Sequence, residues 1–236
     1  MGIFETIFIR RSVRKYDMTP LATEVLADIK MFLDGSNQIA GQKAWFEIVD
    51  AKAVTDDKAP HYIMAYCSAE TSQYINVGYT LQNVDLYLQS KGLGSLWLGM
   101  AKPEDNEDDE RGKDFCIMMA FGKTDVPQRE SQDEFKRLAI SKISDQDNAI
   151  AQAARLAPSA MNSQPWKLKF DSGKVTVEYC GRGLLKAMLK KKMNKIDLGI
   201  VTRHVELALQ HDGKQVTGIK ILNEKKPAVE ITYTVR

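Results

Sequence analysis

An internal repeat is the feature that most constrains the fold of this 236-residue chain. Residues 74–92 align with residues 195–213 at a fixed offset of 121 positions, and seven of the nineteen aligned pairs are identical. About one or two identities would be expected by chance. Two amphipathic helices of similar composition are the simpler alternative, but composition does not explain the shared glycines or the same offset between Trp45 and Trp166. The repeat therefore predicts two structurally similar halves.

Both copies of the repeat are predicted to be long helices. In the first copy, apolar residues recur at 4-3-4 spacing and form one stripe, at Val77, Leu81, Val84 and Leu88. A glycine stands where each helix is expected to end, at Gly92 and Gly213. Another stands near the start of each, at Gly78 and Gly199. A glycine inside a helix costs about 1 kcal/mol relative to alanine. The second pair therefore predicts close helix–helix contact across a pseudo-twofold axis.

The remaining segments predict helices interleaved with strands. Helices are expected over Pro20–Leu33 and Ser144–Leu156, the second with Ser144 as its N-cap and Asp147 three residues on. Strands are expected over Phe46–Ala51, His61–Cys67, Phe115–Phe121, Lys167–Phe170, Val175–Tyr179, Gly218–Leu222 and Val229–Val235. Asp171-Ser172-Gly173 predicts a hairpin turn. This order indicates an α+β fold with mainly antiparallel sheets flanked by helices.

Composition excludes several classes of protein. The chain is 44% hydrophobic and 27% charged, as is typical of globular proteins, and its net charge of +2 does not favour nucleic acid or an anionic membrane as a partner. No stretch approaches the ~20 apolar residues of a membrane span, and the N-terminus lacks the basic region of a signal peptide. Three widely spaced cysteines, Cys67, Cys116 and Cys180, indicate reduced thiols and a cytoplasmic location.

Other familiar sites are not indicated. The glycine-rich motifs of Rossmann folds and P-loops do not occur, and packing or surface roles are favoured for His61, His204 and His211 over a metal site. The acidic run at residues 104–110 is expected to be a solvated loop. The basic run at residues 186–195 is expected to be a solvated helix, with an anionic ligand or partner as the alternative.

A basic motif, Arg10-Arg11-Ser12-Val13-Arg14, follows an apolar stripe that predicts a first helix. One explanation is that cations near the C-terminus of a helix interact favourably with its dipole. The other is an anion site, because guanidinium groups donate paired hydrogen bonds to phosphate oxygens and the Ser12 hydroxyl adds a compact donor.

A second motif lies in the other half, at residues 157–166. Pro158 and Pro165 restrict the backbone at its two ends. Between them stand side chains that both donate and accept hydrogen bonds, namely Ser159, Asn162, Ser163 and Gln164. A surface turn can have this composition. The rigid frame, and the tryptophan that leads into a strand, favour a loop held against a polar ligand.

The two motifs resemble a known family. Residues 10–14 resemble the N-terminal motif of the nitroreductase family of flavin enzymes, and residues 157–166 resemble its Pro-Ser-x-x-Asn-x-Gln-Pro-Trp loop. Residues 76–99 resemble its long central helix and the following loop. Here the Pro-Ser loop follows the central helix and precedes a second copy of it, which is similar to a tandem, single-chain subgroup of the family. The resemblance implies a pseudo-dimer with residues 1–130 and 131–236 as its two integrated halves.

The resemblance also implies a cofactor, FMN, reduced by NADH or NADPH and reoxidised by a nitroaromatic or quinone-like acceptor in a ping-pong cycle. Flavin N5 would carry the chemistry, so no catalytic side chain is expected. The phosphate would be held by Arg10, Ser12 and Arg14 with Arg11, and further by Lys123 or Arg129. From one half, Trp97, Leu98 and Gly99 would lie beside the flavin ring and offer backbone groups to its polar edge. From the other half, Pro158, Ser159, Asn162 and Gln164 would contact the ribityl chain or the ring.

The counterparts of the two motifs at the 121-residue offset lack the residues needed for a second site. Residues 41–45 have no proline or asparagine, and residues 131–135 are acidic and cannot bind a phosphate. One FMN per chain is therefore expected, in a monomer or weak homodimer whose partner is a small-molecule acceptor. Two alternatives remain open: a flavin-binding protein without reductase turnover, and a degenerate family member that serves as a scaffold.

Overall fold

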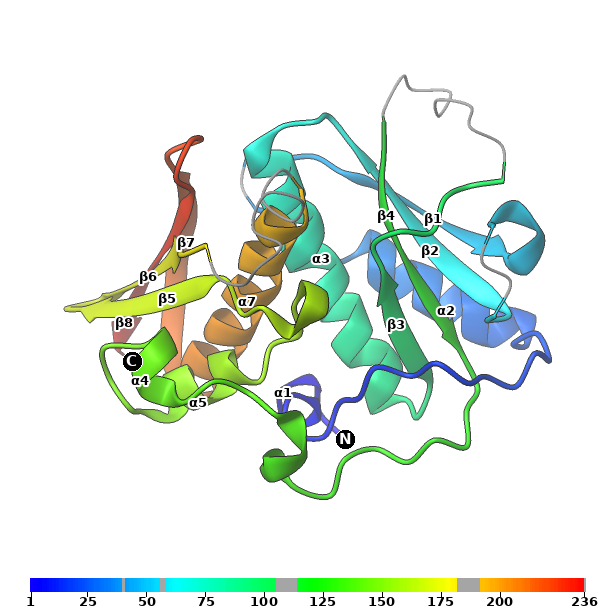
Figure 1. Ribbon diagram of the computed structural model, residues 1–236, viewed down its shortest axis with the longest axis horizontal. Coiled ribbons are helices and arrows are strands. Elements are labelled where there is room, and N and C mark those ends of the chain that lie inside the picture. The colour runs from blue at the N-terminus through cyan, green and yellow to red at the C-terminus, as the bar shows by residue number, and fades with distance from the viewer. Residues whose placement is uncertain (40, 56–57, 105–113, 182–191, 236) are drawn as a thin grey trace.

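The computed structural model describes residues 1–39, 41–55, 58–104, 114–181 and 192–235. Two helices, α3 (Thr71–Ser90) and α7 (Met193–His211), cross at the centre, with one antiparallel sheet on each side of the pair (Figure 1). Each sheet packs against the central helix of its own half. The two halves therefore share one continuous apolar core.

The two sheets have the same strand order. The first contains β1 (Trp45–Asp50), β2 (His61–Cys67), β3 (Gly94–Leu98) and β4 (Asp114–Gly122), in the order β1-β2-β4-β3. The second contains β5 (Trp166–Asp171), β6 (Lys174–Tyr179), β7 (Lys214–Leu222) and β8 (Ala228–Val235), in the order β5-β6-β8-β7. All pairings are antiparallel. The prediction of an α+β fold built from two half-repeats is confirmed.

The two glycines near the helix starts lie where α3 and α7 cross. A Cβ at Gly78 would stand 2.0 Å from the carbonyl oxygen of Ile196, and a Cβ at Gly199 would stand 1.9 Å from that of Ile75. Ile75 and Ile196 are themselves counterparts at the 121-residue offset. The contact is thus reciprocal, as a pseudo-twofold axis requires, and the predicted close approach is confirmed.

The apolar stripe predicted for α3 is buried, and so is the opposite face of the helix. Every residue from Ile75 to Leu86 is buried, including the polar Asn76 and Gln82. A helix between a sheet and a second helix has no solvent-facing side, so its polar residues must find partners inside the protein. Gly92 and Gly213 follow the two helices with φ of +78° and +75°, as predicted for glycines that end helices.

The shorter helices flank the central pair. They are α1 (Ile3–Thr6), α2 (Thr23–Asp34), α4 (Ile140–Ile143) and α5 (Ala149–Arg155), with 3-10 turns η1 (Ala51–Ala53), η2 (Gln132–Phe135) and η3 (Ala160–Asn162). The predicted cap at Ser144 was wrong, because the backbone there is extended and bridges to Leu168. Asn148 is the N-cap of α5, and its Oδ1 accepts a hydrogen bond of 2.9 Å from the Ala151 backbone N–H.

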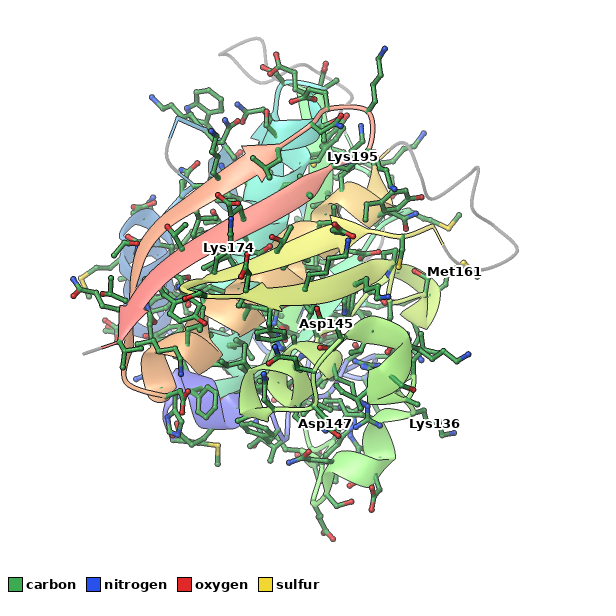
Figure 2. All side chains as sticks on the ribbon, turned by 90° about the vertical axis from the view of Figure 1, so that its left-hand side faces the viewer. Lys136, Asp145, Asp147, Met161, Lys174 and Lys195 are labelled. Carbon is green, nitrogen blue, oxygen red and sulfur yellow. The ribbon has the colours of Figure 1, made fainter. Side chains whose placement is uncertain are left out.

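The outer faces of the two sheets differ. The first sheet is covered by a second apolar cluster around Tyr62, Met64 and Met118. The second sheet carries charged side chains on its outer face, which Figure 2 shows with Lys174 on β6. Lys174 pairs there with Glu230 at 3.3 Å, across adjacent strands. No helix in the described part of the chain is long and apolar enough to cross a membrane. The charge runs at 104–110 and 186–195 lie mostly outside the described residues.

Candidate functional site

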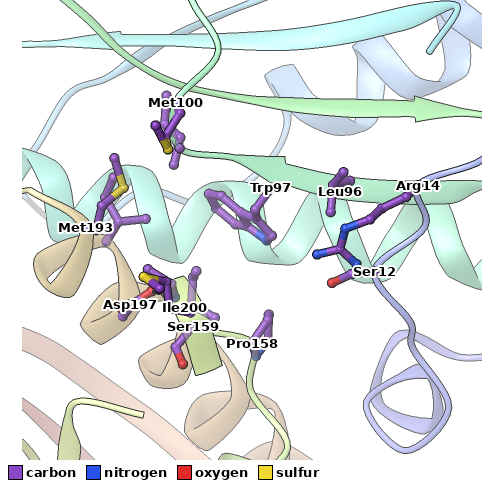
Figure 3. Close-up of a pocket in the computed structure, with 15 residues that line it drawn as sticks. Ser12, Arg14, Leu96, Trp97, Met100, Pro158, Ser159, Met193, Asp197 and Ile200 are labelled. Carbon is purple, nitrogen blue, oxygen red and sulfur yellow. Dashed lines mark hydrogen bonds between the residues drawn. The ribbon is translucent and has the colours of Figure 1, made fainter. Parts of the chain in front are cut away.

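A pocket of about 370 Å³ lies between the two halves of the chain (Figure 3). The first half contributes lining residues from the N-terminal segment and from β3, β4 and the residues after β3, among them Ser12, Arg14, Trp97, Gly99 and Ile117. The second half contributes residues from the Pro-Ser loop and α7, among them Pro158, Ser159, Met193, Asp197 and Ile200. The structure thus brings together parts of the two distant motifs.

Ser12 and Arg14 form a polar end of this pocket. The N-terminal segment is extended here: Ser12 bridges to Ser95 of β3, and the Val13 N–H donates a 3.0 Å hydrogen bond to the Ser95 carbonyl. In an extended segment alternate side chains face the same way. Val13 is buried while Ser12 and Arg14 face the pocket, where Figure 3 shows the guanidinium of Arg14. Arg14 has no carboxylate partner in the described part of the chain, so its charge is available to an anion.

The other two arginines of the motif do not line the pocket. Arg10 is 1% exposed, and its Nε donates a 2.9 Å hydrogen bond to the buried carboxylate of Asp85. Arg11 donates from Nη2 to Glu134 at 2.5 Å. Arg10 thus joins the N-terminal segment to α3, and Arg11 joins it to η2. Their side chains make these contacts and do not line the pocket beside Ser12 and Arg14.

Arg129 and Lys123 also lie outside the pocket lining. The Arg129 backbone N–H donates to the Ile9 carbonyl at 2.9 Å, and its guanidinium lies 4.2 Å from the centre of the Phe135 ring. Burial, and then the charges of Arg10 and Arg11, lower the pKa of Arg129 to about 10. Lys123 is exposed on the strand-to-loop segment after β4. Of the residues expected to hold a phosphate, only Ser12 and Arg14 line the pocket.

The side wall of the pocket is apolar and includes an aromatic ring. Trp97 lies at its centre in Figure 3, with Met193 and Ile200 of α7 nearby. Leu98, which was expected beside the ligand, packs into the apolar cluster on the outer face of the first sheet. The reason is that residues 94–98 form the strand β3 instead of the expected loop, so neighbouring side chains point to opposite faces.

The Pro-Ser loop is held in an unusual conformation. Met161, Asn162 and Gln164 have φ values of +52°, +54° and +45°, a left-handed region that costs free energy for residues other than glycine. Gln164 is buried and its Oε1 accepts a 3.0 Å hydrogen bond from the Leu138 N–H. The Asn162 Oδ1 accepts a 2.6 Å hydrogen bond from Arg137.

These two side chains therefore fix the shape of the loop and do not line the pocket. Pro158 and Ser159 do line it, as expected. The Ser159 Oγ accepts a 2.9 Å hydrogen bond from the Gln164 N–H. Within the described residues the hydroxyl donates no hydrogen bond of its own, so its proton is available to a ligand.

Asp197 of α7 is a pocket residue that sequence reasoning missed. It is 2% exposed, and its Oδ1 accepts a 3.0 Å hydrogen bond from the Ala160 N–H. Burial raises the pKa of Asp197 to about 8, although the Ala160 hydrogen bond acts in the opposite direction. The available signal was its position in the repeat, because the 121-residue offset pairs Asp197 with Asn76.

The chain is similar to several solved structures. The solved structure of a "putative nitroreductase" from Thermotoga maritima is 22% identical, with a TM-score of 0.71, and the match covers 98% of this chain and 94% of that one. A nitroreductase family protein from Clostridium difficile is 17% identical with a TM-score of 0.51, over 63% of this chain and 100% of that one. A protein from Desulfovibrio desulfuricans, solved in complex with FMN, is 17% identical with a TM-score of 0.48, over 63% and 98%.

A search of curated proteins found no match. The model of one protein family, described as "Putative TM nitroreductase", matches residues 2–209. This match spans both halves, including the N-terminal motif, the Pro-Ser loop and nearly all of both central helices. The chain therefore belongs to this nitroreductase family.

Proposed function

We propose that the pocket between the halves binds FMN and that the protein is an FMN-dependent NAD(P)H oxidoreductase. One observation carries the proposal: Arg14, which has no carboxylate partner among the described residues, and the Ser12 hydroxyl stand at a polar end of a pocket whose wall is apolar and aromatic. Membership of the nitroreductase family supports it.

The pocket residues fit the chemical groups of FMN. A guanidinium and a hydroxyl suit a phosphate, which accepts charge-assisted hydrogen bonds. The indole of Trp97 and the side chains of Met193 and Ile200 suit a flat, largely apolar ring. The volume of about 370 Å³ is within the usual range of roughly 300–1,000 Å³ for small-molecule sites.

The chemistry that FMN supplies is two-electron transfer, here between NADH or NADPH and an electron-poor acceptor such as a nitroaromatic compound or a quinone. The chain's own residues bind and orient. Ser12 and Arg14 would hold the phosphate, Ser159 would donate a hydrogen bond from its hydroxyl, and the apolar wall would exclude water from the reacting face. Because these residues come from both halves, neither half alone is expected to bind the cofactor.

The Arg14→Gln variant is expected to bind FMN about 10- to 100-fold more weakly, because a charged hydrogen bond to the phosphate contributes roughly 1.5–3 kcal/mol. Its affinity should also depend less on salt than that of the wild type. FMN dissociation constants at low and high ionic strength, measured by quenching of flavin fluorescence, provide the test. Lys15→Gln is the matched control, since Lys15 is an exposed neighbouring cation that does not line the pocket. Equal affinities of Arg14→Gln and Lys15→Gln would refute the phosphate assignment.

Adding NADH or NADPH to the FMN-loaded protein without oxygen, and following the flavin absorbance, distinguishes a reductase from a flavin-binding protein without turnover. A reductase loses its yellow colour with the donor and regains it when a quinone is added. A protein that binds FMN but keeps its colour with both donors would contradict the enzymatic part of the proposal.

A further inference from the structure

Asp197 and its counterpart Asn76 make the same contact in the two halves. The Asn76 Oδ1 accepts a 2.8 Å hydrogen bond from the Ile39 N–H, and the Asp197 Oδ1 accepts one of 3.0 Å from the Ala160 N–H. Ile39 and Ala160 are also counterparts at the 121-residue offset. In both halves, therefore, a buried side chain of the central helix holds the backbone of the preceding loop.

The second polar atoms of the two side chains differ in their hydrogen bonding. The Asn76 Nδ2 donates a 2.7 Å hydrogen bond to the Oε1 of Gln38, which closes the network within the first half. The Asp197 Oδ2 is buried and has no hydrogen-bond partner in the described part of the chain. Ser159, the counterpart of Gln38, uses its Oγ to accept from Gln164. A buried polar atom without a partner is costly, so Oδ2 is left for a ligand of the pocket that Asp197 lines.

The surroundings of Asp197 disfavour a carboxylate anion. The residues that share the pocket lining with Asp197 from the loop, β3 and β4, namely Ser159, Trp97 and Ile117, are uncharged. Ile75 and Gly78 of α3, which lie against Gly199 and Ile196 on α7, are also uncharged. Arg14 is the other charged residue in the described pocket lining, and Figure 3 shows it on the far side of Trp97. Burial is the main cause of the raised pKa of Asp197, and no cation among the described residues opposes it.

We propose that Asp197 is protonated at neutral pH and donates a hydrogen bond from Oδ2 to an acceptor oxygen or nitrogen of the molecule in the pocket. The proposal rests on the proposed function for the identity of that molecule. Carbonyl oxygens occur both on the flavin ring and on a quinone acceptor, so two sources share this chemistry. In either case the hydrogen bond is lost when Asp197 ionises, and binding becomes dependent on pH.

The Asp197→Asn variant tests the hydrogen bond directly. Asparagine keeps the Oδ1 that accepts from Ala160, as Asn76 does for Ile39, and its Nδ2 donates at every pH. Only protonated wild type would bind fully, so its FMN dissociation constant should rise about tenfold between pH 7 and pH 9. Asp197→Asn should bind with little change over that range, and Asp197→Leu should bind more weakly throughout. Asp212→Asn, at the exposed end of the same helix, should keep the wild-type pH dependence.

The Michaelis constant for menadione, a quinone, distinguishes the two sources. If the hydrogen bond goes to the electron acceptor, the FMN affinity of the wild type does not change with pH. The Michaelis constant for menadione then rises with pH in the wild type but not in Asp197→Asn. The inference is overturned if Asp197→Asn shows the same pH dependence as the wild type in both measurements.

Carbon NMR of the Asp197 carboxyl in the ligand-free protein gives a readout independent of turnover. The inference predicts titration near pH 8, whereas titration near pH 4 overturns it. Wild type that binds no FMN would refute the proposed function, and this titration would still decide whether Asp197 holds a proton.

Discussion

Gly78→Ala and Gly199→Ala are each expected to destabilise the protein by at least about 3 kcal/mol, the upper part of the usual range for overpacking. The added methyl group would stand 2.0 Å from the Ile196 carbonyl oxygen in one case and 1.9 Å from the Ile75 oxygen in the other. Both obstacles are backbone atoms of a helix, so no side chain can rotate away. The clash can be relieved only if α3 and α7 move apart, and the contact between these helices joins the two halves.

Urea denaturation followed by circular dichroism measures this effect. Gly35→Ala is the matched control, because Gly35 follows α2 with an ordinary φ of −84° and its nearest obstacle, the Met31 oxygen, is 3.3 Å away. The control should change the free energy of unfolding by less than about 1 kcal/mol. If all three variants unfold at the same urea concentration, the close crossing of the central helices is not a feature of the folded protein.

Arg10→Met is expected to cost about 3–5 kcal/mol of stability, because it leaves the charge of Asp85 buried without its cation. Asp85 receives four donors: Arg10 Nε at 2.9 Å, Gln82 Nε2 at 2.9 Å, Ser95 Oγ at 2.5 Å and Gln89 Nε2 at 3.2 Å. The remaining three are neutral and compensate only in part. Because this network joins the N-terminal segment to α3 and β3, its loss should also loosen the segment that carries Ser12 and Arg14.

Arg11→Met is the control for this prediction. Its side chain and that of Glu134 are 30% and 38% exposed, so this ion pair should contribute no more than about 1 kcal/mol. The double variant Arg10→Met/Asp85→Leu should recover part of the stability lost in Arg10→Met, since it removes the buried charge as well. The free energy of unfolding of each variant is measured by urea denaturation. If Arg10→Met and Arg11→Met lower it equally, the buried Arg10–Asp85 pair stabilises the protein no more than the exposed pair does.

The repeat made the architecture accessible to sequence reasoning. The fixed offset predicts two similar units. The matched glycines predict a close crossing of the two helices, because a side chain at these positions would keep the helices apart. The positions of the two motifs at one pocket could also be anticipated, because Ser12, Arg14, Pro158 and Ser159 all line it.

Side-chain direction within the motifs could not be predicted. Arg10 and Arg14 have the same side chain and stand in the same short motif. Arg10 is the buried one because it pairs with the carboxylate of Asp85, which is 75 positions away in the sequence. The direction of the Leu98 side chain depends on residues 94–98 forming a strand, which the sequence reasoning took for a loop. Asp197 was missed because it stands among apolar residues of a helix, and its chemistry emerges only when its contacts are compared with those of Asn76.

The flavin-to-chain ratio of the purified protein tests the central claim most directly. After incubation with excess FMN and removal of free ligand, flavin absorbance and protein concentration give the number of FMN molecules per chain. A composite pocket built once from two unequal halves predicts a ratio of one. A ratio of two, or no bound flavin at all, would contradict it.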